Sequence, residues 1–248
     1  SFYFEYDWDD PDGWCVKTWG DGGIYERRIF YDKLRHTTIV DDGRGGKTQY
    51  YGPRSGAAGL CDKIIDPMGV ETHFEWNQLY RKTAEVDGLG NRTEWEHDDR
   101  GNVVSEKNAL GQETRRSFND LNVPVEIVDA AGSAWRMNYD HRAKLTKLVD
   151  PTGAERRYWH DGRGLLLGSE DPLGRKARFE YSAAGDLVSS LDAEGGMTRY
   201  AWDKLGRLTQ HIDPMGRVSK PAHDVCGRVI GILRPDESTL RVVYDPEG

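Results

Sequence analysis

Aspartate is the residue type in this chain whose number and spacing could most readily support chemistry. A pair of carboxylates at a set separation can serve as the acid and the base of a glycosidase. Seven aspartates, however, occupy one position of a repeating unit, three residues before a glycine: Asp66, Asp87, Asp129, Asp150, Asp171, Asp192 and Asp213. A residue that recurs in unit after unit is better explained by a turn, so we predict that these carboxylates close turns and that the chain has no catalytic residue.

The other candidates for metal or cofactor chemistry lack the spacing that such sites require. The histidines show neither HxH nor HExxH spacing, and Cys15, Cys61 and Cys226 are too far apart for a CxxC metal knuckle. The glycine-rich segment 41–46, DDGRGG, lacks the GK[ST] ending of a phosphate loop, and Gly20–Gly23 does not match GxGxxG. We therefore predict no metal site and no cofactor-binding site.

A turn of the form DPxG, with variants such as DGLG and NALG, recurs through most of the chain. Its glycine returns every 21 residues: Gly69, Gly90, Gly111, Gly132, Gly153, Gly174, Gly195 and Gly216. A ninth copy would end at position 237, where Glu237 replaces the glycine. Self-similarity at a fixed period is the signature of a repeat architecture, so the elements that position any functional residue are the repeats themselves.

A second conserved position of the repeat, which we call the aromatic slot, lies seven residues after each glycine. It holds Trp76, His97, Phe118, Tyr139, His160, Tyr181, Trp202, His223 and Tyr244. The next residue is Asp or Asn in eight of the nine copies, and a glycine stands four residues after the slot except at Tyr80, Asn122 and Ala143. Because histidine shares the slot with aromatic residues, we predict that His97, His160 and His223 pack as half-buried rings.

Each repeat predicts an antiparallel hairpin with two kinds of turn. In the copy from 195 to 216, residues 197–202 and 207–212 read as strands, and 203–206 and 213–216 read as the turns that follow them. In DPxG, Asp can bond the backbone, Pro fixes φ and Gly takes the left-handed conformation. The predicted connection is a type I turn closing on a glycine bulge.

Side chains two apart in a strand share a face, so Tyr200 and Trp202 are expected to point the same way. On the return strand we predict that Leu208 and Ile212 also share one face. The same prediction covers Leu187 with Leu191 and Leu145 with Val149. One apolar face per hairpin indicates a single-layer antiparallel sheet, and a lone hairpin should not fold without its neighbours.

Residues 1–59 follow the repeat loosely, whereas residues 60–248 follow it regularly. The step from Gly23 to Gly45 is 22 residues and the next step, to Gly69, is 24, with the extra residues expected in the loop 52–56. We predict irregular opening repeats in residues 1–59 that continue into the same sheet as residues 60–248.

Composition narrows the classes of function. The formal net charge of −8 argues against a nucleic-acid partner, because such proteins concentrate Lys and Arg. The longest apolar runs, such as Leu165–Leu167, fall well short of the ~20 residues that span a bilayer, so no membrane span is predicted in this segment. The first residues are acidic and do not resemble a signal peptide, which predicts either a cytosolic chain or a fragment exported by a signal elsewhere.

The aromatic residues leave one binding function open. Most tryptophans and tyrosines that can be placed fall in repeat positions and should pack on neighbouring hairpins. Five tryptophans lie outside the slot: Trp8, Trp14, Trp19, Trp95 and Trp135. A patch for sugar or peptide binding therefore remains possible among them.

The repeat resembles the RHS/YD repeat family. The clearest copies are Tyr200-Ala-Trp-Asp-Lys-Leu-Gly-Arg-Leu with Asp213–Gly216, and Tyr139-Asp140 with Asp150–Gly153. The resemblance covers residues 60 to 248 strongly. The segment Lys17–Tyr25 also resembles a stretch near the start of the repeat region in bacterial Rhs polymorphic toxins.

This resemblance implies a fold and a function. The expected fold is all-β, with tandem antiparallel hairpins in a curved, spiralling sheet that is part of a hollow shell. The shell would enclose a C-terminal toxin domain, as its partner, in a type VI secretion effector. Spike proteins of the VgrG/PAAR type would be further partners. The resemblance implies a stay in the bacterial cytoplasm before export and secretion thereafter, and the chain is expected to be a piece of a longer protein.

Two other classes of function are weighed against the shell. The first is a surface adhesion or carbohydrate-binding module built on the same repeats. The second is an independent enzyme, for which the sequence offers no constellation of non-repeat residues, so we predict that the chain is not an enzyme.

Overall fold

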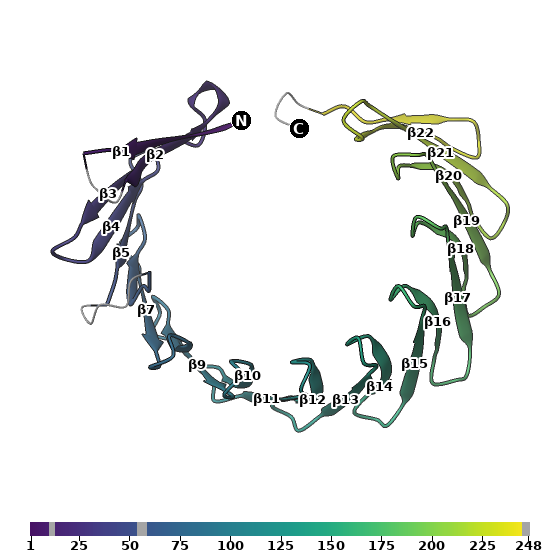
Figure 1. Ribbon diagram of the computed structural model, residues 1–248, viewed down its shortest axis with the longest axis horizontal. Coiled ribbons are helices and arrows are strands. Elements are labelled where there is room, and N and C mark those ends of the chain that lie inside the picture. Colours follow the sequence, from purple (N-terminus) through teal and green to yellow (C-terminus); the bar gives the residue numbers. More distant parts are fainter. Residues whose placement is uncertain (10–12, 54–58, 245–248) are drawn as a thin grey trace. The chain divides into compact units, whose positions relative to one another are not determined.

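The computed structural model describes residues 1–9, 13–53 and 59–244, which form 23 β-strands and one short 3-10 helix, η1 (Asp21–Gly23) (Figure 1). The chain divides into two compact units, residues 1–133 and 134–248. We describe each unit by itself. The positions Asp245 and Gly248, which the sequence assigns to a last turn, and residues 54–56 of the predicted loop lie outside the described residues.

Unit 1 contains the first twelve strands. They are β1 (Phe2–Asp7), β2 (Trp14–Gly20), β3 (Arg27–Asp32), β4 (Thr37–Asp41), β5 (Lys47–Tyr51), β6 (Lys63–Ile65), β7 (Glu71–Trp76), β8 (Lys82–Val86), β9 (Arg92–His97), β10 (Val103–Lys107), β11 (Glu113–Phe118) and β12 (Pro124–Val128). Each strand pairs antiparallel with the next one along the chain, from β1 with β2 to β11 with β12.

Unit 2 contains the remaining strands, paired in the same sequential way. They are β13 (Ala134–Tyr139), β14 (Leu145–Val149), β15 (Glu155–His160), β16 (Leu166–Glu170), β17 (Lys176–Tyr181), β18 (Leu187–Leu191), β19 (Met197–Trp202), β20 (Leu208–Ile212), β21 (Val218–His223), β22 (Val229–Leu233) and β23 (Thr239–Arg241). All of these pairings are antiparallel. The prediction of tandem antiparallel hairpins is confirmed.

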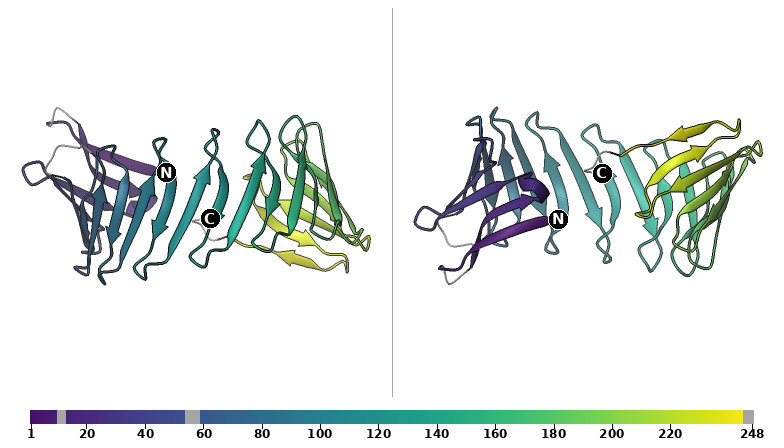
Figure 2. Two further views of the ribbon diagram at one scale, coloured as in Figure 1. Left: turned by 90° about the horizontal axis from the view of Figure 1, so that it is seen from below. Right: turned by 90° about the horizontal axis from the view of Figure 1, so that it is seen from above.

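Each unit is a single layer of sheet with turns along both of its edges (Figure 2). Among the described residues, Ala84 is the hydrophobic side chain that is buried, at 1% exposure, with Thr37 and Ser105 as the buried polar ones. A sheet packed against a second layer would bury a continuous core. Here the apolar side chains are instead half-buried against their cross-strand neighbours.

The DPxG turns have the predicted conformation. Gly69 N–H donates to the Asp66 carbonyl over 3.0 Å, and Gly69 adopts a φ of 82°. The Asp66 carboxylate accepts hydrogen bonds from the backbone N–H groups of Met68 and Val70, at 2.8 and 2.9 Å. This is a type I turn followed by a glycine bulge, and the aspartate carboxylate stabilises it by accepting backbone hydrogen bonds within the turn.

The turns that follow the aromatic slot have the same geometry, even where the sequence lacks glycine. Tyr80, Asn122 and Ala143 adopt φ values of 60°, 57° and 59°. Glu237, in the ninth DPxG position, adopts 65° and donates its N–H to Arg234 O. The repeat therefore imposes the left-handed conformation on residues that bear a Cβ, at a cost of about 1–2 kcal/mol each.

The face predicted for the return strands is wrong, because each regular hairpin contains a β-bulge. In β19–β20, Trp202 lies opposite Leu208 while Arg199 lies opposite Ile212, with a register shift between Ala201 and Trp202. Leu208 and Ile212 therefore lie on opposite faces. The same correction applies to Leu187 with Leu191 and to Leu145 with Val149. One extra residue in the return strand reverses the alternation that an unbroken strand would have.

Candidate functional site

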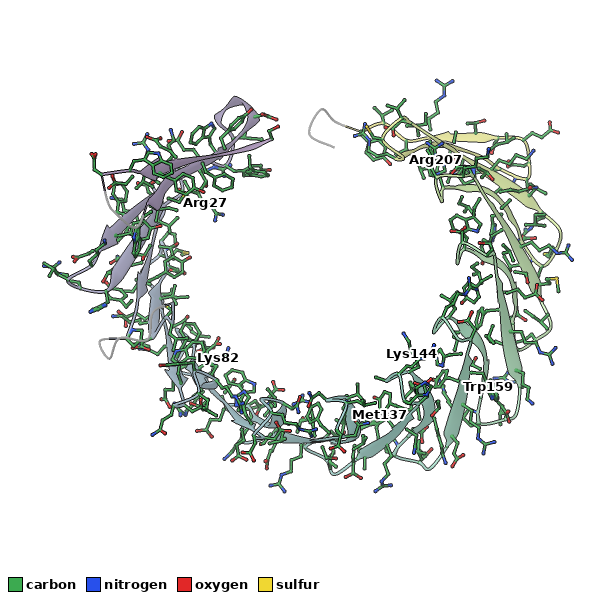
Figure 3. The ribbon with its side chains drawn as sticks, viewed as in Figure 1. Arg27, Lys82, Met137, Lys144, Trp159 and Arg207 are labelled. Atoms are coloured by element: carbon green, nitrogen blue, oxygen red, sulfur yellow. The ribbon has the colours of Figure 1, made fainter. Side chains whose placement is uncertain are left out.

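Each unit presents two faces and two edges that could contact a partner. The face that carries the aromatic slot is called the aromatic face, and the opposite face the polar face. Met137 and Trp159 lie on opposite faces of unit 2 (Figure 3). We name the edge formed by the DPxG turns the DPxG edge, and the edge formed by the turns after the slot the YD edge.

Three slot residues, each a large aromatic side chain with an N–H or O–H donor, form a hydrogen bond to the preceding hairpin. The Trp202 indole N–H donates to Leu187 O over 2.7 Å, and the Trp76 indole N–H donates to Cys61 O over 3.0 Å. The Tyr244 hydroxyl makes the equivalent bond to Val229 O over 3.0 Å. These bonds, which we call slot ties, close the gap between neighbouring hairpins near the YD edge.

Histidines in the slot leave this gap without such a bond. His97, His160 and His223 are half-buried at the positions that the sequence predicts. The Nδ1 atoms of His97 and His160 are buried without a hydrogen-bond partner. An imidazole is shorter than an indole, and no described hydrogen bond joins these rings to the strand before them.

Arginines of the YD turns form a second kind of connection, which we call the arginine tie. The Arg81 guanidinium donates to the carbonyls of Asp98 and Asp99 in the next YD turn, the latter over 2.9 Å. Arg163 donates to the carbonyls of Ser182 and Ala183 over 3.2 and 3.1 Å. Equivalent bonds run from Arg100 to Asn119, from Arg142 to Gly162 and from Arg207 to Asp224.

Within each unit, the two kinds of tie replace each other along the described YD turns. We call the connection from one YD turn to the next a step, and name it by the slot residue of the second hairpin. Arginine ties make this connection where that slot residue is His97, Phe118, His160, Tyr181 or His223. The step from turn 182–185 to turn 203–206 has no described arginine tie, because Ala184 and Asp186 stand where other turns carry a cation, and here Trp202 forms the slot tie. The sequence analysis did not predict this alternation. It could have been inferred from Trp202, which stands in the slot where the preceding turn has no arginine.

The five tryptophans outside the slot have different local environments. Trp14 packs edge-on against Tyr31 with ring centroids 4.3 Å apart, and Trp19 stacks on Tyr3 at 5.7 Å. Trp95 in β9 is covered by the Lys82 ammonium at 4.3 Å. Trp135 is half-buried in β13 of unit 2, and Trp8 is 80% exposed beyond the end of β1.

Trp159 is an exposed tryptophan that the sequence analysis did not single out. It stands between Tyr158 and His160, out of phase with the slot, so that it lies on the polar face with 43% exposure. It lies opposite Gly168, where a Cβ would be 3.6 Å from the Trp159 ring. The sequence could have predicted this, because Trp159 is one residue from the slot residue His160 and neighbouring side chains in a strand point to opposite faces.

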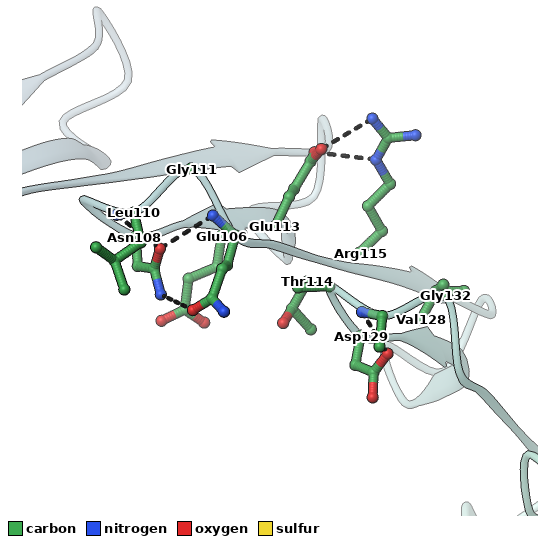
Figure 4. A pocket seen from close by; sticks show the side chains of 13 residues that line it. Glu106, Asn108, Leu110, Gly111, Glu113, Thr114, Arg115, Val128, Asp129 and Gly132 are labelled. Atoms are coloured by element: carbon green, nitrogen blue, oxygen red, sulfur yellow. Dashed lines mark hydrogen bonds and ion pairs between the residues drawn. The ribbon is translucent and has the colours of Figure 1, made fainter.

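A groove on the DPxG edge of unit 1 lies between turns 108–111 and 129–132 (Figure 4). Its carboxylates already have partners: Glu113 is paired with Arg115 at 2.9 Å, and Glu106 with Arg116 at 2.9 Å. The groove therefore presents no unpaired carboxylate pair of the kind that glycoside hydrolysis uses. Elsewhere, no group of three or more His, Cys, Asp or Glu among the described residues could hold a metal ion.

The turn aspartates carry the clearest electrostatic effect. The backbone N–H groups of Lys144 and Arg142 lower the pKa of the Asp140 carboxyl. The N–H four residues further on is likewise the largest cause of the lowered pKa at Asp161, Asp203 and Asp224. Hydrogen bonds to the ionised form favour that form, so these carboxylates are turn supports and not proton donors near neutral pH.

The described residues contain no helix that is long and apolar enough to cross a membrane.

Comparison with known proteins identifies the repeat. Residues 160–196 and 181–218 match the RHS Repeat family. None of the curated proteins matches this sequence. The fold is similar to the crystal structure of TcdB2-TccC3-TEV, with a TM-score of 0.73 and 17% identity over 98% of this chain and 15% of that one.

Two further solved structures are similar over the whole chain. The crystal structure of TcdB2-TccC3 gives a TM-score of 0.57 at 15% identity and covers 100% of this chain and 18% of that one. The Tc holotoxin pore of Photorhabdus luminescens gives 0.57 at 16% identity and covers 100% and 17%. This chain thus spans less than a fifth of the length of these solved chains.

Proposed function

Since this chain is an array of RHS repeats, we propose that it is a wall segment of a hollow shell that encloses a toxic domain. Its role is structural and not catalytic. The enclosed partner is a C-terminal toxin domain of the longer protein to which the segment belongs.

The observation that carries this proposal is a sheet one layer thick. Each unit has one buried hydrophobic side chain or none among its described residues, and successive hairpins are joined by ties at the YD edge. Such a sheet can be extended by adding hairpins, because each repeat contacts its neighbours in the row. A single-layer sheet that can be lengthened in this way can form the wall of a shell. It lacks the hydrophobic core that positions the catalytic residues of a compact enzyme.

The likeness to TcdB2-TccC3 supports the same proposal at the level of fold. We further propose that residues 1–59 are irregular opening repeats and residues 60–248 regular ones, within one array. For delivery we propose a type VI secretion effector with spike proteins of the VgrG/PAAR type as partners. The protein would reside in the bacterial cytoplasm before export and be secreted afterwards.

Protease protection of the full-length protein tests enclosure. An intact shell should protect the C-terminal domain from a protease that degrades the same domain when it is expressed alone. Loosening the wall, by Trp202→His, should expose the domain at lower protease concentrations. Equal digestion of the enclosed and the isolated domain would exclude a shell.

A surface adhesion or carbohydrate-binding module is the second candidate. The observation in its favour is the pair of exposed tryptophans, Trp8 at 80% and Trp159 at 43% exposure, since indole rings stack on sugars. Glycan-array binding by the chain that disappears in Trp159→Ala, with the fold retained, would favour adhesion over enclosure.

A further inference from the structure

The DPxG edge of unit 1 carries a row of protruding apolar side chains. In three successive turns the third residue is large and apolar: Met68, Leu89 and Leu110, with 88%, 89% and 83% exposure. The three turns have the same backbone hydrogen bonds, so these side chains occupy equivalent positions. Described strands precede the first of these turns and follow the last, so the exposure does not come from an end of the chain.

The fourth turn of the row has a hollow where the others have a large side chain. Turn 129–132 carries Ala131 at its third position. The groove between this turn and turn 108–111 has a volume of about 840 Å³, and Leu110, Ala130 and Ala131 line it (Figure 4). We call these four turns, residues 66–69, 87–90, 108–111 and 129–132, the apolar edge.

The apolar edge has no charged residue at the centre of its turns. The two central residues are Pro67-Met68, Gly88-Leu89, Ala109-Leu110 and Ala130-Ala131. The first residue of each turn is Asp or Asn, and its side chain is engaged within the turn. The Asp87 carboxylate, for example, accepts the backbone N–H groups of Leu89 and Asn91, both at 2.9 Å. The turn centres therefore present apolar surface.

The other described edges do not match this surface, because they carry charges at their turns. On the YD edge of unit 1, Asp99, Arg100 and Asp120 stand at the turn centres. On the DPxG edge of unit 2, Arg175 pairs with Glu194 at 3.0 Å. Burial of such charged groups against apolar surface is costly. The surface that suits the apolar edge is therefore the same edge of a second copy.

The row is self-complementary under a two-fold rotation. Its turns recur on every second strand, so they are evenly spaced, roughly 10–12 Å apart. An axis between turns 87–90 and 108–111 places Leu89 opposite Leu110 of the other copy, and Met68 opposite Ala131. Met68 then enters the groove beside Ala131. A methionine suits this position, because its unbranched side chain fills irregular gaps.

The area of this contact is enough for a small dimer. The three protruding side chains of each copy supply roughly 100 Å² of apolar surface apiece, or about 600 Å² for the two copies. Because interfaces are about 60% apolar by area, the whole contact covers about 1,000 Å². That is close to the lower limit for a specific interface, so the dimer should be weak and concentration-dependent.

We propose that the apolar edge of unit 1 binds the same edge of a second copy of this chain, in a two-fold dimer. Met68 of each copy lies in the groove beside Ala131 of the other. Asp66, Asp87 and Asp129 stand behind the protruding side chains in both copies, so added salt should strengthen the dimer by screening their repulsion. This association goes beyond the proposed enclosure and does not depend on it.

Sedimentation velocity of the whole chain across a concentration series tests the proposal. Leu89→Glu should raise the dissociation constant at least about tenfold, because it buries a charge in the contact. Leu110→Gln should also raise it, which separates the loss of apolar contact from charge repulsion. Leu173→Glu is the matched control and should have no effect, because Leu173 holds the same turn position in unit 2 with 79% exposure.

Cross-linking tests the register of the dimer. In a Cys226→Ser background, a mixture of Met68→Cys and Ala131→Cys chains should form an intermolecular disulfide, because the two positions meet across the axis. Met68→Cys alone should not cross-link, since its two copies lie roughly 30 Å apart. Equal cross-linking in Met68→Cys alone would overturn this arrangement.

Two outcomes of the sedimentation series would overturn the dimer itself. One is a chain that stays monomeric at all concentrations, and the other is an association that Leu89→Glu leaves unchanged. A monomeric chain that binds phosphatidylcholine vesicles, and loses this binding in Leu89→Glu, would assign the apolar edge to a membrane surface instead.

Discussion

Two hairpins of unit 2, those with His160 and Trp202 in the slot, are joined to the preceding hairpin at the YD edge by different hydrogen bonds. Before His160, Arg142 reaches from one YD turn to the Gly162 carbonyl of the next. Before Trp202, the preceding turn has Ala184 and no arginine, and the indole itself donates to Leu187 O at 2.7 Å. Each described step within unit 2 thus has a donor at the YD edge, which either the slot or the preceding turn supplies.

This comparison explains why the slot tolerates histidine. A histidine whose Nδ1 is buried and unpaired contributes packing but no tie, and the arginine of the preceding turn supplies the missing connection. The two positions are therefore expected to be coupled energetically, because residues that serve one contact are not independent.

Acidification should have the largest effect, because it acts on the turns of both kinds of step at once. The folded-state pKa values of Asp140, Asp161, Asp203 and Asp224 are lowered. A lowered pKa gives stability that is present above the unfolded value, about 3.9, and is lost as pH falls below it. The midpoint of thermal unfolding should be steady from pH 7 to about 5 and fall steeply below about pH 4. A steep fall already between pH 7 and 6 would contradict the assignment of this stability to the turn aspartates.

Among the substitutions, Trp202→His should lower the free energy of unfolding most, because it leaves the Trp202 hairpin with neither a slot tie nor an arginine tie. Trp202→His removes buried ring area and the slot tie, which should lower the free energy of unfolding by about 2–4 kcal/mol. Adding Ala184→Arg should recover about 1 kcal/mol by building the arginine tie. Urea denaturation of the single and double variants measures this coupling. Additive effects of the two substitutions would refute the interchange of ties.

Removing an arginine tie should cost less, because the guanidinium is half-exposed. Arg163→Ala should lower the free energy of unfolding by about 1 kcal/mol through loss of its bonds to Ser182 and Ala183. Lys204→Ala is the matched control, since Lys204 makes no polar contact among the described residues. Hydrogen exchange should speed up at the YD edge in Arg163→Ala and stay unchanged in the control. Equal exchange in both variants would show that the arginine tie does not hold the edge.

Relieving backbone strain in the His160 step should have the smallest effect. Ala143 has a φ of 59°, so Ala143→Gly should raise the free energy of unfolding by about 1 kcal/mol. The reverse change, Gly164→Ala, should destabilise, because its φ is 84° and a Cβ would lie 2.7 Å from the Lys144 side chain. Thermal unfolding of both variants measures the difference. A destabilised Ala143→Gly would contradict the assignment of strain.

The sequence predicts those parts of the fold that local chemistry determines. The turn geometry follows from Asp66 and Gly69, and the positions of the strands follow from the 21-residue period. The faces of Leu208 and Ile212 could not be read correctly, because a bulge reverses the alternation and the bulged residue carries no distinctive side chain. The arginine tie joins residues 17 to 20 apart, on turns that meet only after the hairpins have paired.

Electron cryomicroscopy of the full-length protein that contains this chain tests the central claim most directly. The claim predicts a hollow particle whose wall is a single layer of β-hairpins, with these repeats in the wall and density for another domain inside. A solid globule or an extended, open rod of repeats with no enclosed density would contradict it.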